Sequence, residues 1–297
     1  MLWAQSYGPL GNDGIGSPCK VMTDQALYLK SIEYRIKLLK YIKMAGAGHT
    51  GGSLSCVDIL NVLYNCILNV TPESFNDPRR DRYIQSKGHS VEALYVVLAD
   101  RGFFPEEELE TFCGYGSHYT GHPTRQVKGI EQNTGGLGHG LAFSVGVALA
   151  GQLDHAAYRV FTLLGDGELA EGSNWESLMA AAHYRLDNLC IIVDRNTLQL
   201  TGKTEDMCGL EPLVQKLEAF GGEVRMVDGH NITALAEVLG RLPFTAGKPS
   251  VVIAKTIKGK GISFMENNPK WHHGVPDDRQ YEQAQQELEA RRAEIRS

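Results

Sequence analysis

The stretch LLGDGELAEGSNWESL, residues 163–178, combines an apolar run, a sharp Gly-Asp-Gly turn and a helical pattern. A strand that ends in such a turn and leads into a helix is where an α/β protein binds phosphate, because the helix N-terminus offers free N–H groups. Asp166 lies between Gly165 and Gly167, where a bare carboxylate would repel an anion. We therefore expect a divalent cation between this carboxylate and a phosphate group.

The chain on both sides of this turn alternates between short β-branched runs and helical patterns. Strands are predicted at 82–86, 159–164, 189–193, 223–227 and 250–255, and helices at 23–45, 53–69, 90–101, 105–113, 140–152, 172–184, 211–220 and 231–240. This alternation predicts an α/β fold with a doubly wound, mostly parallel sheet and helices on both faces. We expect an irregular tail at 1–22, one domain at 23–276, and a charged C-terminal helix or arm at 277–297.

Composition and charge narrow the class of protein. The 297 residues carry a formal net charge of −6, which argues against a nucleic-acid partner. The apolar stretch at 141–151 is too short and too interrupted by glycine to cross a membrane. Residues 1–22 lack the pattern of a signal peptide, and the six cysteines are widely spaced, as in reduced thiols. These features predict a cytoplasmic protein without a membrane partner.

Two predicted strands end in polar residues that suit a metal. Asp166 follows the strand at 159–164, and Asn196 follows the strand at 189–193. If the strands are neighbours, both side chains emerge at the carboxyl edge of the sheet, where ligands bind. A carboxylate and an amide oxygen form part of a shell that Mg²⁺ completes with phosphates and water.

A dinucleotide site is the competing interpretation of the same turn. Residues 165–170 fit the G-x-G-x-x-A fingerprint, and Asp194 closes the next strand, as a ribose-binding acid would. Against it, Asp166 and Glu168 would place unscreened carboxylates beside a pyrophosphate, and the motif lies in the middle of the chain. A dehydrogenase and a turn without a ligand remain alternatives at this point.

Glycine also adjoins several of the ten histidines, among them His49, His89, His122, His139 and His273. Glycine permits sharp turns, and imidazole donates or accepts protons near neutral pH. If these loops converge, they form a pocket for hydroxyls, carbonyls and phosphates. The basic segment at 255–261 is predicted to be either a solvated loop or one that closes over an anion.

From about residue 24 to 276 the chain resembles the transketolases, in their N-terminal, diphosphate-binding half. Six segments carry the resemblance in the family's order: AGAGHTGGSLSCVD (45–58), SKGHSVEALYVVLADRGF (86–103), GSHYTGHPT (116–124), NTGGLGHGLAFSVGVALA (133–150), GDGELAEGSNWE through DRNTLQLTG (165–202), and TIKGKGISFMENNPKWHHGVP (256–276). The family usually has Gln in place of His139 and an acid in place of Thr124, and Arg195 is unusual within the metal turn. None of these departures changes the expected metal ligands themselves.

The resemblance implies a thiamine diphosphate-binding fold with thiamine diphosphate and Mg²⁺, for which Ca²⁺ or Mn²⁺ could substitute. It implies metal ligation by Asp166, Asn196 and the backbone carbonyl of Leu198. It implies cofactor contacts from His89, Gly135, Gly136, Leu137, Gly165, Asp166, Gly167, Glu171, Asn196 and His273. His49, His122 and His273 would be the catalytic residues that face the sugar, and Glu171 and Glu176 match acids near the family's subunit contact.

The implied activity is transfer of a two-carbon ketol unit from a ketose phosphate to an aldose phosphate. The family's pyrimidine-binding and C-terminal domains are missing from the sequence, so we expect a transferase completed by a second chain that carries them. A homodimer of this chain, formed through 140–151 and the Glu171 region, would lie within a heterotetramer. The alternatives are half of a 1-deoxyxylulose-phosphate synthase-like enzyme, a dedicated unusual-sugar transketolase, or a non-catalytic subunit of that fold.

Overall fold

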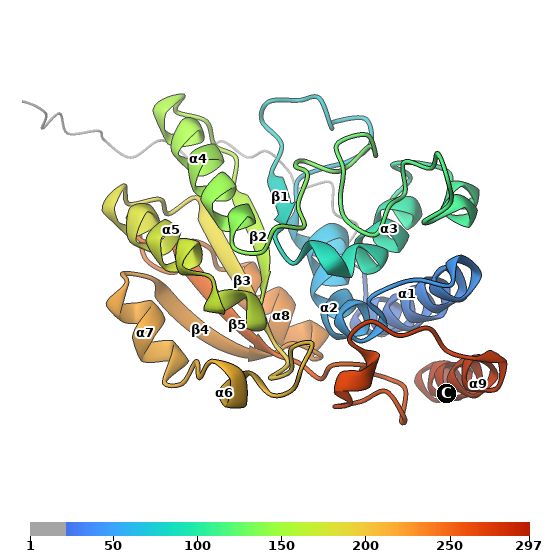
Figure 1. The fold of residues 1–297 in the computed structure, drawn as a ribbon. Coiled ribbons are helices and arrows are strands. Elements are labelled where there is room, and N and C mark those ends of the chain that lie inside the picture. The colour runs from blue at the N-terminus through green and yellow to red at the C-terminus, as the bar shows by residue number, and fades with distance from the viewer. Residues whose placement is uncertain (1–21) are drawn as a thin grey trace, which may run out of the picture.

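The structure, a computed structural model, describes residues 22–297 and contains one five-stranded sheet (Figure 1). Residues 1–21 of the expected N-terminal tail lie outside the described part. The strands are β1 (Arg82–Gln85), β2 (Val160–Gly165), β3 (Leu189–Arg195), β4 (Glu223–Asp228) and β5 (Ser250–Lys255). They pair in parallel throughout, in the order β1-β2-β3-β5-β4. The predicted parallel α/β sheet is confirmed.

Helices cover both faces of the sheet, as the doubly wound prediction requires (Figure 1). They are α1 (Asp24–Ala45), α2 (Thr50–Val62), α3 (Val91–Asp100), α4 (His139–Leu153), α5 (Gly172–His183), α6 (Thr204–Met207), α7 (Leu213–Ala219), α8 (Ile232–Leu239) and α9 (Asp278–Arg296). Alternate residues along β3 separate the two cores: Ile192 packs with α1, α2, α3 and α8, whereas Ile191 packs with α4, α5 and α7. None of the helices described is long and apolar enough to cross a membrane.

Three predicted helices differ in detail from the structure. The helix predicted at 53–69 already begins at Thr50 and ends in a π-helical turn, Leu63–Ile67. The segment predicted as a helix at 105–113 forms a short 3₁₀-helix, Glu106–Thr111, a form that suits pieces too short for stable α-helix. The helix predicted from residue 90 is preceded by a 3₁₀ turn, Gly88–Ser90, which carries His89.

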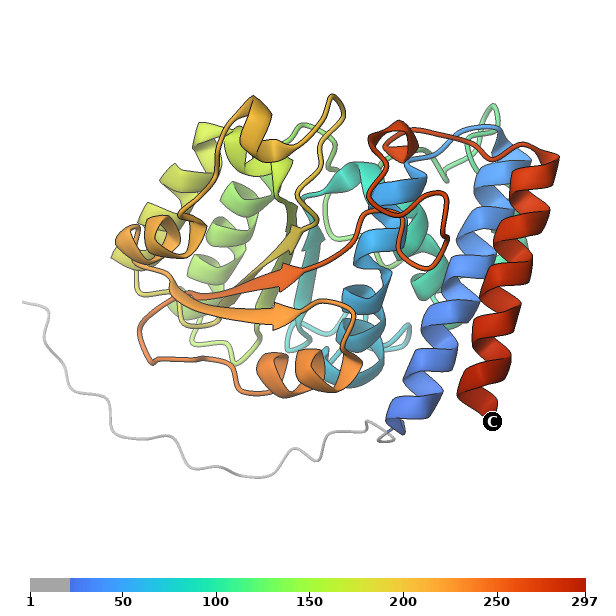
Figure 2. The same cartoon turned by 90° about the horizontal axis from the view of Figure 1, so that it is seen from below.

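The charged C-terminal segment forms α9, which lies alongside α1 (Figure 2). Ala284 and Leu288 are its buried residues. At one end Lys43 forms an ion pair with Asp278, with 2.8 Å between Nζ and Oδ1. Near the middle Glu287 accepts hydrogen bonds from the backbone N–H and the hydroxyl of Ser263, both at 2.7 Å. The helix therefore supports the loop that leads to His272 and His273.

Candidate active site

The sheet brings Asp166 and Asn196 to the same edge. β2 and β3 are neighbours, and Gly165 pairs in register with Asp194, so the two strands end side by side. Asp166 is only 1% exposed, and its Oδ2 accepts a hydrogen bond from the Thr197 N–H at 2.5 Å. Asn196 Oδ1 accepts one from the Leu198 N–H at 3.1 Å. The three residues predicted as metal ligands thus lie around one short turn.

These oxygens match the preferences of a hard cation. A carboxylate, an amide oxygen and a backbone carbonyl suit Mg²⁺, which keeps positions for phosphate and water. Burial and the nearby charge of Asp194 raise the pKa of Asp166, although Thr197 and Arg195 oppose the shift. A divalent cation would supply the missing positive charge. Within residues 22–297 no group of three or more His, Cys, Asp and Glu could hold a metal, so this site depends on amide and backbone oxygens.

Arg195 contacts one of these ligands, which its position in the sequence did not reveal. Its Nη1 lies 3.1 Å from Asp166 Oδ2, and its Nη2 contacts Glu205 and Glu211 at 2.8 and 3.0 Å. The guanidinium therefore contacts one carboxylate oxygen of an expected metal ligand. The set of expected ligands stays as predicted, and Arg195 adds a contact to Asp166 that the sequence did not reveal.

Five histidines from four segments of the chain converge beside the turn, and His49 lies at their centre. Its ring centroid is 4.7 Å from that of His273, 5.3 Å from His89, 5.7 Å from His272 and 6.0 Å from His122. A backbone bridge between His49 and Gly274 joins two of the loops. Sequence reasoning missed His272, whose only signal was its position next to His273. His139 lies exposed outside the group, with Nδ1 2.9 Å from the Leu137 carbonyl oxygen.

The surroundings of four of these imidazoles favour their neutral forms. Burial, followed by the charges of nearby imidazoles and lysines, lowers the pKa of His49 to about 4. Burial and Lys258 lower the pKa of His272 to about 3, and burial also lowers the pKa of His122. The pKa of His89 also lies well below its ordinary value, mainly because the ring is buried. At neutral pH the rings of His49, His89, His122 and His272 therefore each have one donor and one acceptor nitrogen, which suits the orientation of sugar hydroxyls.

Two buried lysines place positive charge beside the oxygen ligands. Lys258 Nζ lies 3.0 Å from the Leu198 carbonyl oxygen and 2.7 Å from His272 Nδ1. Burial and the charge of Lys87 lower the pKa of Lys258 to about 7. Burial also acts to lower the pKa of Lys87, but the neighbouring charge of Asp194 outweighs it, so the pKa of Lys87 is raised overall. The segment at 255–261 is therefore not simply a solvated loop, because its central lysine points into a site suited to an anion.

Asp194 lies beneath this edge of the sheet and accepts hydrogen bonds from the side chains around it. It is fully buried and accepts hydrogen bonds from Ser55 at 2.6 Å and from Asn196 Nδ2 at 3.3 Å, and also from Thr256 and Lys87. These contacts turn the amide nitrogen of Asn196 toward Asp194 and leave Asn196 Oδ1 for other partners. A ribose-binding acid must face the ligand, so the buried ion pair of Asp194 argues against the dinucleotide site.

Glycine-rich segments complete the site beside His122. Gly135 has φ +145°, and a Cβ there would lie 3.0 Å from His122 Cδ2, so a side chain would crowd the imidazole. Glu168, which sequence reasoning did not select, accepts hydrogen bonds from the N–H groups of Gly138 and Gly165 at 2.9 and 3.1 Å. Glu171 lies exposed at the N-cap of α5, beside Gly138.

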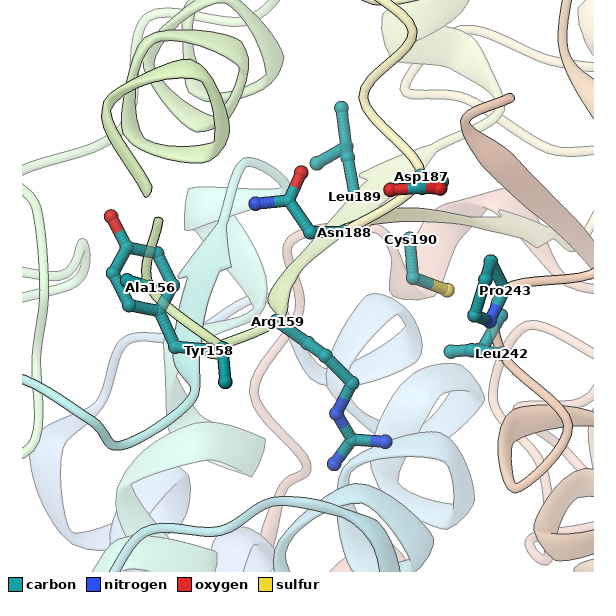
Figure 3. Close-up of a pocket in the computed structure, with 10 residues that line it drawn as sticks. Ala156, Tyr158, Arg159, Asp187, Asn188, Leu189, Cys190, Leu242 and Pro243 are labelled. Atoms are coloured by element: carbon teal, nitrogen blue, oxygen red, sulfur yellow. The ribbon is translucent and has the colours of Figure 1, made fainter. Parts of the chain in front are cut away.

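A separate cavity of about 280 Å³ lies at the opposite edge of the sheet (Figure 3). Tyr158 and Arg159 line it just before β2, and Asp187 and Asn188 line it just before β3. It contains none of the predicted site residues. In open parallel sheets ligands bind at the carboxyl ends of the strands, which is the edge that carries the histidines.

The fold and the site are those of an α/β domain suited to a diphosphate. Residues 30–292 match the family described as transketolase, thiamine diphosphate binding domain, and the chain belongs to this family. The chain is 45% identical to one of the subunits of the apulose-4-phosphate transketolase of Phocaeicola vulgatus, over 91% of this chain and 96% of that protein. It is 40% identical to a 6-deoxy-6-sulfo-D-fructose transketolase subunit of a Clostridium species, over 84% of this chain and 92% of that protein.

Solved structures support the same fold. The transketolase of Campylobacter jejuni superposes with a TM-score of 0.84 at 28% identity. The match covers 92% of this chain but 46% of that protein, so the chain spans about half the length of this solved transketolase.

Proposed function

We propose that the chain is the diphosphate-binding half of a two-chain transketolase that transfers a ketol unit between phosphosugars and depends on thiamine diphosphate and Mg²⁺. One observation carries the proposal. Asp166 and Asn196, two buried lysines and five imidazoles lie together at the carboxyl edge of the sheet. The apulose-4-phosphate transketolase relative supports it, because that protein is named as one subunit of an enzyme and this chain covers 96% of it. When bound, the cofactor supplies an electron sink for breaking and forming a bond beside a carbonyl.

The chain's own residues would bind and orient the reactants. Asp166, Asn196 and the Leu198 carbonyl would hold Mg²⁺, and Lys258 with Gly167 would contact the diphosphate. His89, Gly165 and the Gly135–Leu137 segment would complete the cofactor contacts, as the family resemblance implies.

The proton chemistry would fall to the imidazoles that face the sugar. His49, His122 and His273 would orient hydroxyl groups and move protons between oxygen atoms. The lowered pKa values of His49 and His122 support such a role, because a neutral ring can accept a proton that a charged ring cannot.

The partner would be a second chain that carries the pyrimidine-binding and C-terminal domains, within a heterotetramer. The surface of α4 and α5 supports a contact between copies of this chain, because Phe143, Leu153 and Met179 are exposed there. We place the enzyme in the cytoplasm, a reducing compartment that suits free thiols such as those of the buried Cys56 and Cys190.

A dedicated unusual-sugar transketolase is the second candidate for the substrate range. Two relatives are named for apulose 4-phosphate and 6-deoxy-6-sulfo-D-fructose, which favours such sugars over those of the pentose phosphate pathway. The catalytic proposal is the same for either range, since only the sugars differ.

Reconstitution tests the proposal. We expect no ketol transfer from xylulose 5-phosphate, or from the sugars for which the two relatives are named, until the second chain, thiamine diphosphate and Mg²⁺ are all present. Full activity of this chain alone would contradict the two-chain assignment. Unchanged activity after Asp166→Ala would contradict the metal site.

A further inference from the structure

A buried polar network lies behind the sheet edge, outside the cluster of five histidines. Arg35 of α1 and Asp58 of α2 form a two-pronged ion pair, with Nη1–Oδ1 and Nη2–Oδ2 distances of 2.8 and 2.7 Å. His230, in the turn between β4 and α8, places Nδ1 2.7 Å from Asp58 Oδ2. The side chains of Arg35 and Asp58 are both about 6% exposed. We call these three residues the Arg35–Asp58–His230 network.

Both ends of this network hold the loop that carries Lys258. The Ile257 N–H donates to His230 Nε2 at 2.8 Å, and Arg35 Nε donates to the Lys260 carbonyl oxygen at 3.0 Å. Because a backbone N–H can only donate, His230 Nε2 must be the acceptor nitrogen, and Nδ1 then carries the hydrogen toward Asp58. The network therefore forms hydrogen bonds with the backbone on both sides of Lys258.

Further contacts hold the backbone of this loop next to Lys258. The Gly259 N–H donates to the Gly51 carbonyl at 3.0 Å, and the Asn267 N–H donates to the Lys258 carbonyl at 2.9 Å. Gly259 has φ +80°, and a Cβ there would lie 2.3 Å from the Met265 carbonyl oxygen. With the backbone held in this way, the Lys258 side chain extends toward the Leu198 carbonyl.

The stability of the fold does not by itself explain why this buried network is present. Buried ion pairs lose about as much free energy by desolvation as they gain by attraction. α1 and α2 already pack through apolar residues, among them Leu38 and Leu54. What the network adds is a fixed position for two backbone groups of the loop.

We propose that the Arg35–Asp58–His230 network is a positioning device for Lys258. It holds the loop so that the ammonium group points at the Leu198 carbonyl and the neighbouring diphosphate site. His230 acts only through Ile257 and touches neither cofactor nor substrate. The inference rests on the proposed function, because it assumes that Lys258 faces a bound diphosphate.

Two substitutions of His230 separate its two contacts. In His230→Gln the side-chain oxygen reaches the position of Nε2 and still accepts from Ile257. In His230→Asn the amide nitrogen takes the place of Nδ1, so the contact with Asp58 remains and the contact with Ile257 is lost. In the two-chain complex we expect H230N to weaken magnesium–thiamine diphosphate binding about tenfold, and H230Q to stay within about threefold of wild type.

Two readouts other than activity complete the test. Titration calorimetry gives the dissociation constant, and amide hydrogen exchange reports protection of Ile257, which we expect H230N to lose and H230Q to keep. Lys258→Met provides a double-mutant cycle: if His230 acts through Lys258, adding H230N to K258M should weaken binding no further. If H230N does not fold, Arg35→Lys, which gives up the Lys260 contact, replaces it in the cycle.

Equal loss in H230N and H230Q, additive effects with K258M, or unchanged Ile257 exchange in H230N would each overturn the positioning role. Absence of cofactor binding by the wild-type complex would instead overturn the proposed function. The exchange measurement does not depend on the cofactor, so the two failures are distinguishable.

Discussion

Glu168 links the strand-end turn to the glycine loop before α4, and we expect its replacement to be costly. The side chain is 2% exposed, and its two oxygens accept from the Gly138 and Gly165 N–H groups. Both oxygens face donors, so Glu168→Gln would turn an NH₂ group toward a backbone N–H. The loss of one charge-assisted hydrogen bond in a buried site costs about 2 kcal/mol of unfolding free energy. Glu168→Ala removes both acceptors and should cost about 4 kcal/mol.

Urea unfolding at pH 7.5, followed by circular dichroism, measures these differences. Glu176→Gln is the matched control, because it makes the same charge change on the exposed face of α5. We expect the control to stay within about 0.5 kcal/mol of wild type. If E168Q unfolds at the same urea concentration as E176Q, the carboxylate does not accept from both glycines, and the reasoning is refuted.

Three further predictions concern the metal, pH and assembly. Asp166→Ala should weaken magnesium-dependent thiamine diphosphate binding at least about 100-fold by calorimetry with unchanged circular dichroism, and near-wild-type affinity would contradict the metal site. The pKa of His49 is lowered to about 4 in the folded chain, so the unfolded chain binds that proton first, and stability should fall as the pH drops from about 6.5 toward 4. Urea midpoints at pH 5 and 7.5 should therefore differ less in His49→Gln than in wild type, and an equal difference would count against the assignment. Phe143→Arg should reduce self-association in sedimentation experiments, and an unchanged oligomer would show that the apolar α4 surface is not the contact.

Much of the fold was predictable because local patterns determine it. The β-branched runs and the glycine turns placed each strand within two residues of its position in the structure. The order of the strands was not predictable in this way, because nothing in the local pattern states that β5 inserts between β3 and β4. The metal hypothesis depended on β2 and β3 being neighbours, which only the assembled sheet could establish.

The site was predictable where glycine adjoined a functional residue and less so elsewhere. His49, His89 and His122 carried that signal and do converge. His272 and Lys258 enter the site through contacts between distant segments, such as the hydrogen bond at 2.6 Å from the Thr50 hydroxyl to the Gly274 carbonyl. Such contacts leave no periodic trace in the sequence, so neither residue could be chosen from spacing alone.

Helix α9 has a consequence for how the chain tolerates shortening. Its charged sequence looks dispensable, yet Glu287 secures Ser263, at the start of the loop that ends in the two histidines. Cutting the chain before Glu287 would free that loop and remove Leu288 from the core beside α1, but would leave the five-stranded sheet whole. A trimmed protein should therefore hold its ligand poorly even where the sheet stays folded, so ligand affinity has to be measured together with melting temperature to find where this domain ends.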